Sequence, residues 1–286
     1  MRQAASVRRI LHRSAALSCL ALTVLWTNPS ASATGGAASA LDEIRERGIL
    51  VAGISRNTPP FAQQGGDGEP RGFDVDLIDG LAARLGVQVR YVPLSGAARI
   101  AAVEAGRVHL TAATLTATAE RRRLVDFSST YFHDSRRILV RNDSAIAGAE
   151  DLAGQQVGVA GGATGRALLG LAPAAIPVTF ASCREALPAL LAGRIDAIAA
   201  EASILQGLLG LLASPDSLRI VGDTFSRQSY SLALPKDDPR WHQQVNSYLR
   251  AIEDEGSWEI MARRWFGERG PLPYPDGFHP VAGESR

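Results

Sequence analysis

The stretch from Thr114 to Ser128 carries residue types that together could hold an anion. It reads TLTATAERRRLVDFS. The hydroxyl of Thr118 is placed to cap a helix that begins at Ala119, since an N-cap oxygen accepts a hydrogen bond from an amide of the first turn. Free amides at the helix start, the hydroxyl of Thr116 and the guanidinium of Arg121 would then meet at one point. Such a meeting point favours a carboxylate.

A second interpretation of the same stretch is a solvated run of charge. Arg121, Arg122 and Arg123 follow one another directly. A cation in the first turn of a helix also opposes the helix dipole, which favours anions at that end. The local sequence leaves both interpretations open, so the choice depends on what other elements bring to this stretch.

Other patterns that could carry chemistry are weaker. The glycine-rich turn at 161–165 follows an expected strand and opens an expected helix, but it lacks the glycine spacing and the lysine of nucleotide-binding loops. The five histidines show no metal-ligand spacing, and the chain contains no nucleophile motif. We therefore expect no catalytic residue, no metal site and no cofactor.

The first 33 residues have the composition of a secretory signal peptide. Arginines precede an apolar run from Ala15 to Trp26, which is short for a membrane span, and the small residues 31–33 fit a cleavage site. We expect cleavage near Ala33, export to the periplasm, and a leader over residues 34–41.

Cleavage would change the charge balance of the chain. Residues 1–33 hold four arginines and no acidic residue, so the formal net charge falls from +1 to about −3. With no basic stretch beyond residues 121–123, the sequence argues against a nucleic-acid partner. Of the two cysteines, Cys183 alone would remain, so we expect no intramolecular disulfide.

Strand-like and helix-like segments alternate before the anion-binding stretch. Residues 49–54 form an apolar run typical of a buried strand, and residues 73–85 have apolar side chains at helical spacing. Further strands are expected at 87–92 and 108–113, with a helix at 97–105 between them. This alternation predicts an α/β domain with a largely parallel sheet.

A second block with the same alternation begins after Asp143. Its expected strands are 156–160, 178–181 and 195–200, and its expected helices are 166–171, 183–192 and 204–212. The chain then returns with a strand at 229–234, a mostly helical segment at 241–266 and a loose tail at 271–286. Ligands of α/β sheets lie outside the carboxyl ends of strands, so two such blocks would form the walls of a cleft.

Several segments, taken in order, resemble the extracellular solute-binding proteins of family 3, the amino-acid receptors of ABC importers. The segments are Pro59–Phe61, Gly72–Leu77, Thr114–Arg121, Val125–Ser128, Asp151–Gly154, Val157–Val159, Gly193–Asp196 and Arg264–Gly267. Each is weak alone, but their order and spacing together are specific. The resemblance extends from about Leu41 to Gly267.

The resemblance implies a two-lobed periplasmic-binding-protein fold of type II, a Venus flytrap, in which two strands cross the hinge. Residues 42–134 and 235–270 would form lobe 1, and residues 138–228 would form lobe 2. The hinge strands are expected near His133–Ile138 and Gln228–Leu234. Closure of the lobes around a ligand is the expected motion.

The resemblance also implies ligand contacts, position by position. Arg121 matches the arginine that pairs with the α-carboxylate of an amino acid, and Thr116 matches a hydroxyl beside it. Thr114 stands where backbone groups meet the ligand, and Thr164 matches a second-lobe donor to the same carboxylate. Glu201 stands where the family usually has an aspartate that partners the α-ammonium.

Four further positions concern the side-chain end of the pocket. Asp74 is expected near it, with local capping as the alternative, and Phe61 is expected to pack near the cleft, with core packing as the alternative. Ser55 occupies a position that is acidic in receptors for basic amino acids. Arg99 matches an arginine that binds the side-chain carboxylate in receptors for acidic amino acids. Glutamate or aspartate is therefore the first expectation, and a neutral polar amino acid such as glutamine is the second.

The implied partners are an L-amino acid and the membrane permease subunits of an ABC transporter, and we expect a monomer. Two other functions stay open. One is a cyclohexadienyl dehydratase that acts on prephenate or arogenate with the same fold and uses Glu201 or Asp74 as its acid. The other is a ligand sensor.

Overall fold

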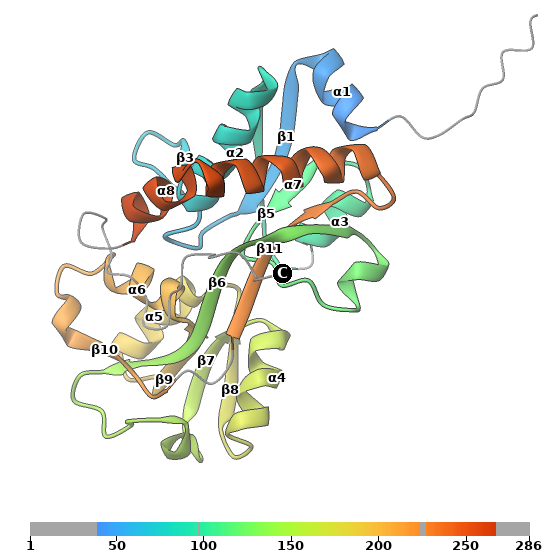
Figure 1. Cartoon of the computed structure of the whole chain (residues 1–286). Coiled ribbons are helices and arrows are strands. Elements are labelled where there is room, and N and C mark those ends of the chain that lie inside the picture. The colour runs from blue at the N-terminus through green and yellow to red at the C-terminus, as the bar shows by residue number, and fades with distance from the viewer. Residues whose placement is uncertain (1–38, 97, 224–226, 267–286) are drawn as a thin grey trace, which may run out of the picture. The chain divides into compact units, whose positions relative to one another are not determined.

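The structure, a computed structural model, describes residues 39–96, 98–223 and 227–266 (Figure 1). The expected signal peptide at 1–33 and the tail at 271–286 lie outside these residues. The strands are β1 (Ile49–Ser55), β2 (Gln63–Gln64), β3 (Pro70–Arg71), β4 (Gln88–Leu94), β5 (Leu110–Ala112), β6 (Asp126–Arg141), β7 (Gln156–Ala160), β8 (Ile176–Phe180), β9 (Ala197–Glu201), β10 (Leu218–Val221) and β11 (Arg227–Leu234). The α-helices are α1 (Ala40–Arg47), α2 (Phe73–Leu85), α3 (Ala98–Glu104), α4 (Gly162–Leu171), α5 (Cys183–Leu191), α6 (Ala202–Leu209), α7 (Pro239–Asp254) and α8 (Ser257–Trp265). Short 3-10 helices are η1 (Arg121–Arg123), η2 (Ala149–Leu152) and η3 (Pro215–Ser217).

The main sheet of the described chain has the strand order β4-β1-β5-β11-β6-β9-β7-β8, with β10 also paired to β6. β1 runs parallel to β4 and β5, and β7 runs parallel to β8 and β9. Between these two parallel blocks, β11 and β6 run antiparallel to their neighbours. The expected α/β class is confirmed, and the sheet is mixed because the two joining strands are antiparallel.

The long strand β6 changes its partner in the middle of its length. It pairs with β11 between Asp126 and Ser135, and with β9 between Arg136 and Val140. In Figure 1, β6 and β11 lie side by side and connect the two parallel blocks. This agrees with the expected pair of strands that cross between two lobes. The pairing of β6 with β11 also shifts register near Tyr230, as a β-bulge does.

Helix α2 begins where the packing leaves no room for a side chain. Its N-cap residue Gly72 has a φ of 151°, and a Cβ there would lie 1.9 Å from the backbone oxygen of Phe61. Glycine is required by this close approach. The helix ends at Gly86, whose left-handed φ of 69° is the common helix terminator. The expected bounds Phe73–Leu85 are confirmed.

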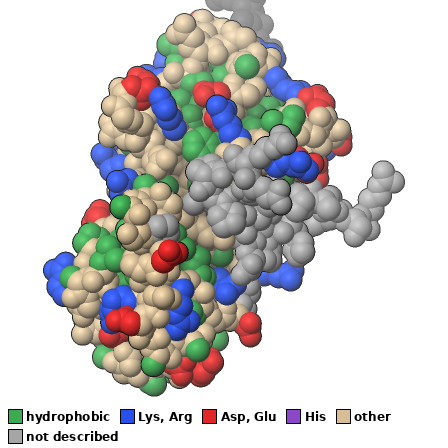
Figure 2. Space-filling model, turned by 90° about the vertical axis from the view of Figure 1, so that its left-hand side faces the viewer, with side chains coloured by type: hydrophobic (Ala, Val, Ile, Leu, Met, Phe, Trp, Pro, Cys, Tyr) green, Lys and Arg blue, Asp and Glu red, His purple; other side chains and the backbone are tan. Residues whose placement is uncertain are grey.

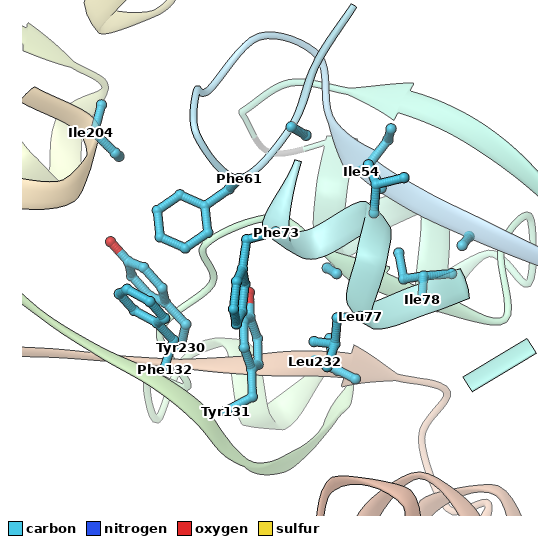
Figure 3. Packing of buried hydrophobic residues seen from close by; sticks show 14 of the residues in the cluster. Ile54, Phe61, Phe73, Leu77, Ile78, Tyr131, Phe132, Ile204, Tyr230 and Leu232 are labelled. Carbon is cyan, nitrogen blue, oxygen red and sulfur yellow. The ribbon is translucent and has the colours of Figure 1, made fainter. Parts of the chain in front are cut away.

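A cluster of aromatic rings packs α2 against the two joining strands (Figure 3). The ring of Phe61 meets Phe73, Phe132 and Tyr230 edge-on, with centroids 6.2, 5.0 and 5.5 Å apart. Phe132 of β6 stacks on Tyr230 of β11 with an interplanar angle of 11°. Such ring pairs contribute roughly 0.5–1.5 kcal/mol beyond the area that they bury. The cluster therefore ties the joining strands to the first parallel block.

The start of the described chain and its last two helices meet on the first block. Asp238 caps α7 by accepting a hydrogen bond from the backbone N–H of Trp241 over 3.0 Å. The same carboxylate accepts from Ser39 Oγ over 2.8 Å and from the N–H of Ala40 over 2.7 Å, at the start of α1. One side chain thus satisfies amides at two helix N-termini, where the helix dipoles also favour its charge.

On the face drawn in Figure 2, positive and negative side chains are interspersed among hydrophobic and other side chains. Within the described ranges, every helix is too short or too polar to cross a bilayer.

Four segments differ clearly from the sequence-based expectations. The helix expected from Ala119 is limited to the short η1, and α4 already begins at Gly162, inside the expected glycine-rich turn. Strand β6 begins at Asp126, well before the expected hinge segment, and β10 is not expected at all. In β6 the reason is compositional, because buried polar residues such as Asp134 interrupt the apolar pattern by which a strand is found.

Candidate functional site

A cavity of about 560 Å³ opens between the two parallel blocks. Its lining comes from the segments that follow the carboxyl ends of β1, β4, β5, β7, β8 and β9, and from the joining strands. This is where ligands bind in α/β sheets. The charged side chains among the described lining residues are Arg99, Arg121, Arg136, Arg184 and Glu201.

Arg121 reaches the cavity from the start of η1. Its backbone N–H donates to Thr118 Oγ1 over 3.3 Å, so Thr118 has the capping contact expected of it. The Arg121 guanidinium Nη1 donates to the backbone oxygen of Thr116 over 2.9 Å. Burial lowers the pKa of Arg121 below its ordinary value, because desolvation disfavours the cation. A ligand anion bound to this guanidinium would offset the unfavourable loss of hydration.

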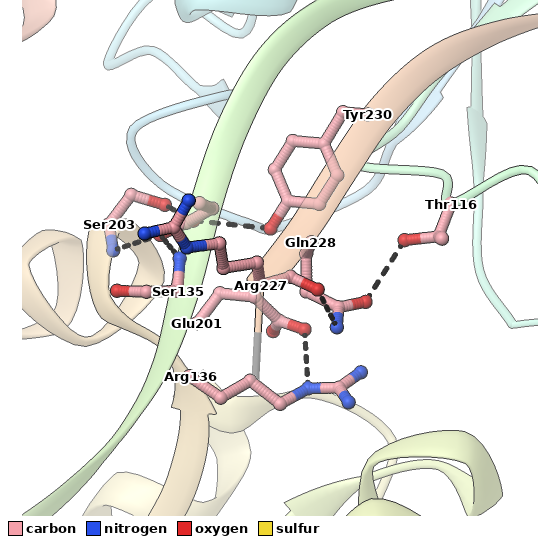
Figure 4. A network of polar contacts seen from close by, with 9 residues as sticks. Thr116, Ser135, Arg136, Glu201, Ser203, Arg227, Gln228 and Tyr230 are labelled. Carbon is pink, nitrogen blue, oxygen red and sulfur yellow. Dashed lines mark hydrogen bonds and ion pairs between the residues drawn. The ribbon is translucent and has the colours of Figure 1, made fainter. Parts of the chain in front are cut away.

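The segment after β5 contributes two hydroxyl side chains to the lining. Thr114 has a left-handed backbone with a φ of 49°, which is uncommon for a β-branched residue. Thr116 Oγ1 donates to Oε1 of Gln228 over 3.1 Å, which joins the segment to β11 (Figure 4). Both residues line the cavity together with Arg121.

Arg99 of α3 enters the cavity from the side of β1 and β5. Its Nη1 donates to the backbone oxygen of Ala113 over 3.1 Å, and its Nη2 donates to Ser55 Oγ over 3.0 Å. Ser55 is buried and lies behind Arg99 rather than in the lining. Its side chain therefore positions the guanidinium. Burial lowers the pKa of Arg99, the nearby carboxyl of Asp74 opposes this shift, and the positive charge of Arg121 adds to it.

Glu201 lies on the opposite wall, at the end of β9. It stands directly across from Arg136 in the pairing of β9 with β6. Arg136 Nε donates to Glu201 Oε1 over 3.1 Å, and the two side chains are 11% and 13% exposed (Figure 4). The carboxylate that the sequence assigns to a ligand ammonium is thus already paired with a guanidinium of the same chain.

Asp74 lies behind the cavity rather than in it. Its side chain is fully buried, and Oδ1 accepts a hydrogen bond from the hydroxyl of Tyr131 over 2.8 Å. Burial raises the pKa of Asp74 to about 7, and the Tyr131 hydroxyl, the Arg99 guanidinium and the Thr114 amide oppose this rise.

Two further candidates take different places. Phe61 is completely buried in the aromatic cluster and is absent from the lining, which corresponds to the core-packing alternative. Thr164 falls within α4, but its side chain lies outside the part of the chain that the structure describes.

The structure adds lining residues that the sequence did not single out. Arg136 belongs to the segment expected to cross the hinge, but nothing in that segment indicates which of its side chains faces inward. Arg184 follows the start of α5, and its Nη1 donates to Oδ1 of Asn57 across the cavity mouth over 2.8 Å. Phe180 and Gln228 also line the cavity.

The described residues contain no group of three or more His, Cys, Asp or Glu side chains that could hold a metal ion. The thiol of Cys183 lines the cavity, where burial raises its pKa to about 12. It is therefore protonated and a poor nucleophile at neutral pH.

Comparison with known proteins agrees with this geometry. The family model described as bacterial extracellular solute-binding proteins, family 3, matches residues 50–268. The L-cystine-binding protein of Escherichia coli (strain K12) is 31% identical over 230 residues, which cover 79% of this chain and 86% of that protein.

Two solved structures have a similar fold. An ancestral arginine-binding protein bound to glutamine has a TM-score of 0.72 at 31% identity, covering 78% of this chain and 99% of that chain. An ancestral amino acid-binding protein, a precursor of cyclohexadienyl dehydratase, has a TM-score of 0.72 at 31% identity, covering 80% of this chain and 99% of that chain.

Proposed function

This chain belongs to the bacterial extracellular solute-binding proteins, family 3, and on that premise we propose that it captures an L-amino acid in the cavity and delivers it to the membrane permease subunits of an ABC transporter. The preferred ligand is acidic, glutamate or aspartate. A neutral polar amino acid such as glutamine is the alternative. The ligand leaves the protein chemically unchanged.

The observation that carries this proposal is the pair Arg99 and Arg121. Both guanidinium groups line the cavity, and their hydrogen-bond partners in the described chain are neutral oxygens. Partial burial of a cation without a paired anion is costly, so two such guanidinium groups at one cavity favour a ligand that brings two carboxylates. Arg121 would hold the α-carboxylate, and Arg99 would hold the side-chain carboxylate.

The opposite wall supports capture by closure. Arg184 donates to Asn57 across the cavity mouth. Gly207 of α6 lies so close to the loop after β1 that a Cβ there would be 2.3 Å from the backbone oxygen of Pro59. We propose lobe 1 as residues 42–134 and 235–270, and lobe 2 as residues 138–228. In this proposal β6 and β11 bend as the lobes open and close.

The proposal also covers the export of the protein and its oligomeric state. The chain would be exported to the periplasm with cleavage near Ala33, and it would act as a monomer. Mass spectrometry of the protein recovered after export would give the cleavage position. Light scattering would give the oligomeric state.

A thermal-shift screen followed by calorimetry tests the function. The exported protein would be unfolded in denaturant to remove any retained ligand, refolded, and screened against the twenty amino acids. A ligand that binds only the folded state raises the midpoint of unfolding. We expect glutamate or aspartate to give the largest rise. A screen in which no amino acid raises the midpoint would refute the proposal.

The similarity to a precursor of cyclohexadienyl dehydratase makes that enzyme the second candidate. Its acid would have to be Glu201, which is paired with Arg136, or Asp74, which lies outside the lining. Incubation with prephenate and arogenate decides between the two functions. Turnover that is lost in Glu201→Gln would favour the enzyme.

A further inference from the structure

The cavity has a lopsided distribution of charge. Among the described residues that line it, four arginines face one acidic side chain, Glu201. A ligand that carries both an ammonium and a carboxylate needs an anion for the first and a cation for the second. The described lining therefore offers four cations that could pair with a carboxylate, but one anion, Glu201, that could pair with an ammonium.

That one anion is already neutralised. The guanidinium of Arg136 lies opposite Glu201 on the neighbouring strand and donates from Nε to Oε1 over 3.1 Å (Figure 4). Both side chains are largely removed from water, and breaking a buried pair is strongly unfavourable because it leaves an uncompensated charge. A ligand ammonium would have to compete with a guanidinium held in place by the backbone.

Arg99 and Arg121, unlike Glu201, are hydrogen-bonded only to neutral groups of the described chain. Arg121 donates to the backbone oxygen of Thr116, and Arg99 donates to the oxygens of Ala113 and Ser55. Among the described residues, no carboxylate lies within 4.0 Å of either guanidinium. Asp74 acts on Arg99 from inside the core, and Arg99 and Arg121 repel each other.

We propose that this cavity recognises its ligand as a dicarboxylate, through Arg99 and Arg121. An α-ammonium on the ligand adds little to the affinity, because Glu201 is already paired with Arg136. Five-carbon diacids without an amino group, such as glutarate, are then ligands of the same site. This inference rests on the proposed function, since it concerns the same cavity and deepens the identity of its ligand.

Calorimetry with L-glutamate, glutarate and L-glutamine on the exported protein tests the inference. We expect glutarate to bind within about tenfold of L-glutamate. Binding of L-glutamate with glutarate more than tenfold weaker would overturn the inference and leave the proposed function standing. Failure of all amino acids and diacids to bind would overturn the proposed function as well.

The variant Arg136→Gln separates the role of the pair from a general loss of fold. Freeing Glu201 should raise the preference for L-glutamate over glutarate by about tenfold or more. The neighbouring Arg137→Gln is the matched control, because Arg137 lies on the same strand but outside the lining, and we expect its preference to be unchanged. An unchanged preference in Arg136→Gln would contradict the inference.

The variant Glu201→Gln gives a second test in case Arg136→Gln does not fold. In Glu201→Gln, the affinities for L-glutamate and glutarate should change by the same factor, because neither ligand uses this carboxylate. A loss of tenfold or more that is confined to L-glutamate would show that Glu201 binds the ammonium after all, and would overturn the inference.

Discussion

The hydroxyl of Tyr131 donates a hydrogen bond to Oδ1 of Asp74 over 2.8 Å, and both side chains are buried in the wall behind the cavity. The second oxygen of Asp74, Oδ2, has no partner within the described chain. Burial raises the pKa of this carboxyl from 3.8 to about 7. The folded protein therefore binds the proton more tightly than the unfolded chain does. It follows that the contribution of Asp74 to the free energy of unfolding falls as the pH rises from about 4 to about 7.

Asp74→Asn should remove this part of the pH dependence. The amide keeps an oxygen to accept from Tyr131 but cannot ionise. We expect the variant to be more stable than the wild-type protein at pH 8, and to lose less stability between pH 5 and pH 8. Urea unfolding at several pH values measures both effects.

The matched control for this measurement is Asp143→Asn, whose side chain is 84% exposed. It should follow the wild-type curve. Some pH dependence should remain in Asp74→Asn, because burial also raises the pKa of Asp134 to about 7. Curves for Asp74→Asn and the wild-type protein that run parallel over the whole range would contradict the account.

Arg121→Ala should reduce the affinity for the amino acid by about 100-fold or more and leave the fold intact. The substitution removes one partner of a charge-assisted contact, which typically costs 2–5 kcal/mol. Arg123→Ala is the control, because Arg123 is an exposed neighbour in η1 that does not line the cavity. Calorimetry on both variants decides the matter. Affinity near the wild-type value in Arg121→Ala would refute the placement of the carboxylate.

Arg99→Gln should weaken L-glutamate far more than L-glutamine. The substituted amide can still donate a hydrogen bond, but it no longer offers a charge to a second carboxylate. The exposed Arg107→Gln serves as the control. The ratio of the two affinities, measured by calorimetry, is the readout. Equal losses for both ligands would remove the case for an acidic side chain.

Gly207→Ala should impair the contact between α6 and the loop after β1. A Cβ at Gly207 would lie 2.3 Å from the backbone oxygen of Pro59, a distance that requires the backbone to move. We expect a loss of stability of about 1–3 kcal/mol, as for other overpacked sites, together with weaker ligand binding. Gly170→Ala in α4 is the control, because open space surrounds its Cβ position. Wild-type stability and affinity in Gly207→Ala would contradict a close contact here.

The elements that sequence reasoning found are those with a clear period and clear ends. α2 combines helical apolar spacing with Gly72 before it and Gly86 after it, and β7 is a short apolar run between turns. The elements that it missed lack such a period, as in the first half of β6. The two walls of the cavity could be expected because strands of an α/β sheet end in ligand-binding turns.

The charge state of the site could not be read from the sequence. The pairing of Arg136 with Glu201 depends on the register of two strands whose residues are 65 positions apart. The burial of Asp74 depends on Tyr131, which comes from a distant part of the chain. Residue types alone therefore identify candidate ligand-binding side chains. Long-range pairing determines which of their charges are left unpaired and can bind a ligand.

Asp238 bears on how the protein is made. It closes the N-terminus of α1 through Ser39 and Ala40, which precede it by 199 and 198 positions. β11, which completes the sheet of the first block beside β5, also comes late in the chain. A ribosome must therefore release residue 238 before the first block has all of its contacts, and native structure this non-local forms slowly. For most of its synthesis the chain therefore lacks a finished first block, because Asp238 and β11 have not yet been added.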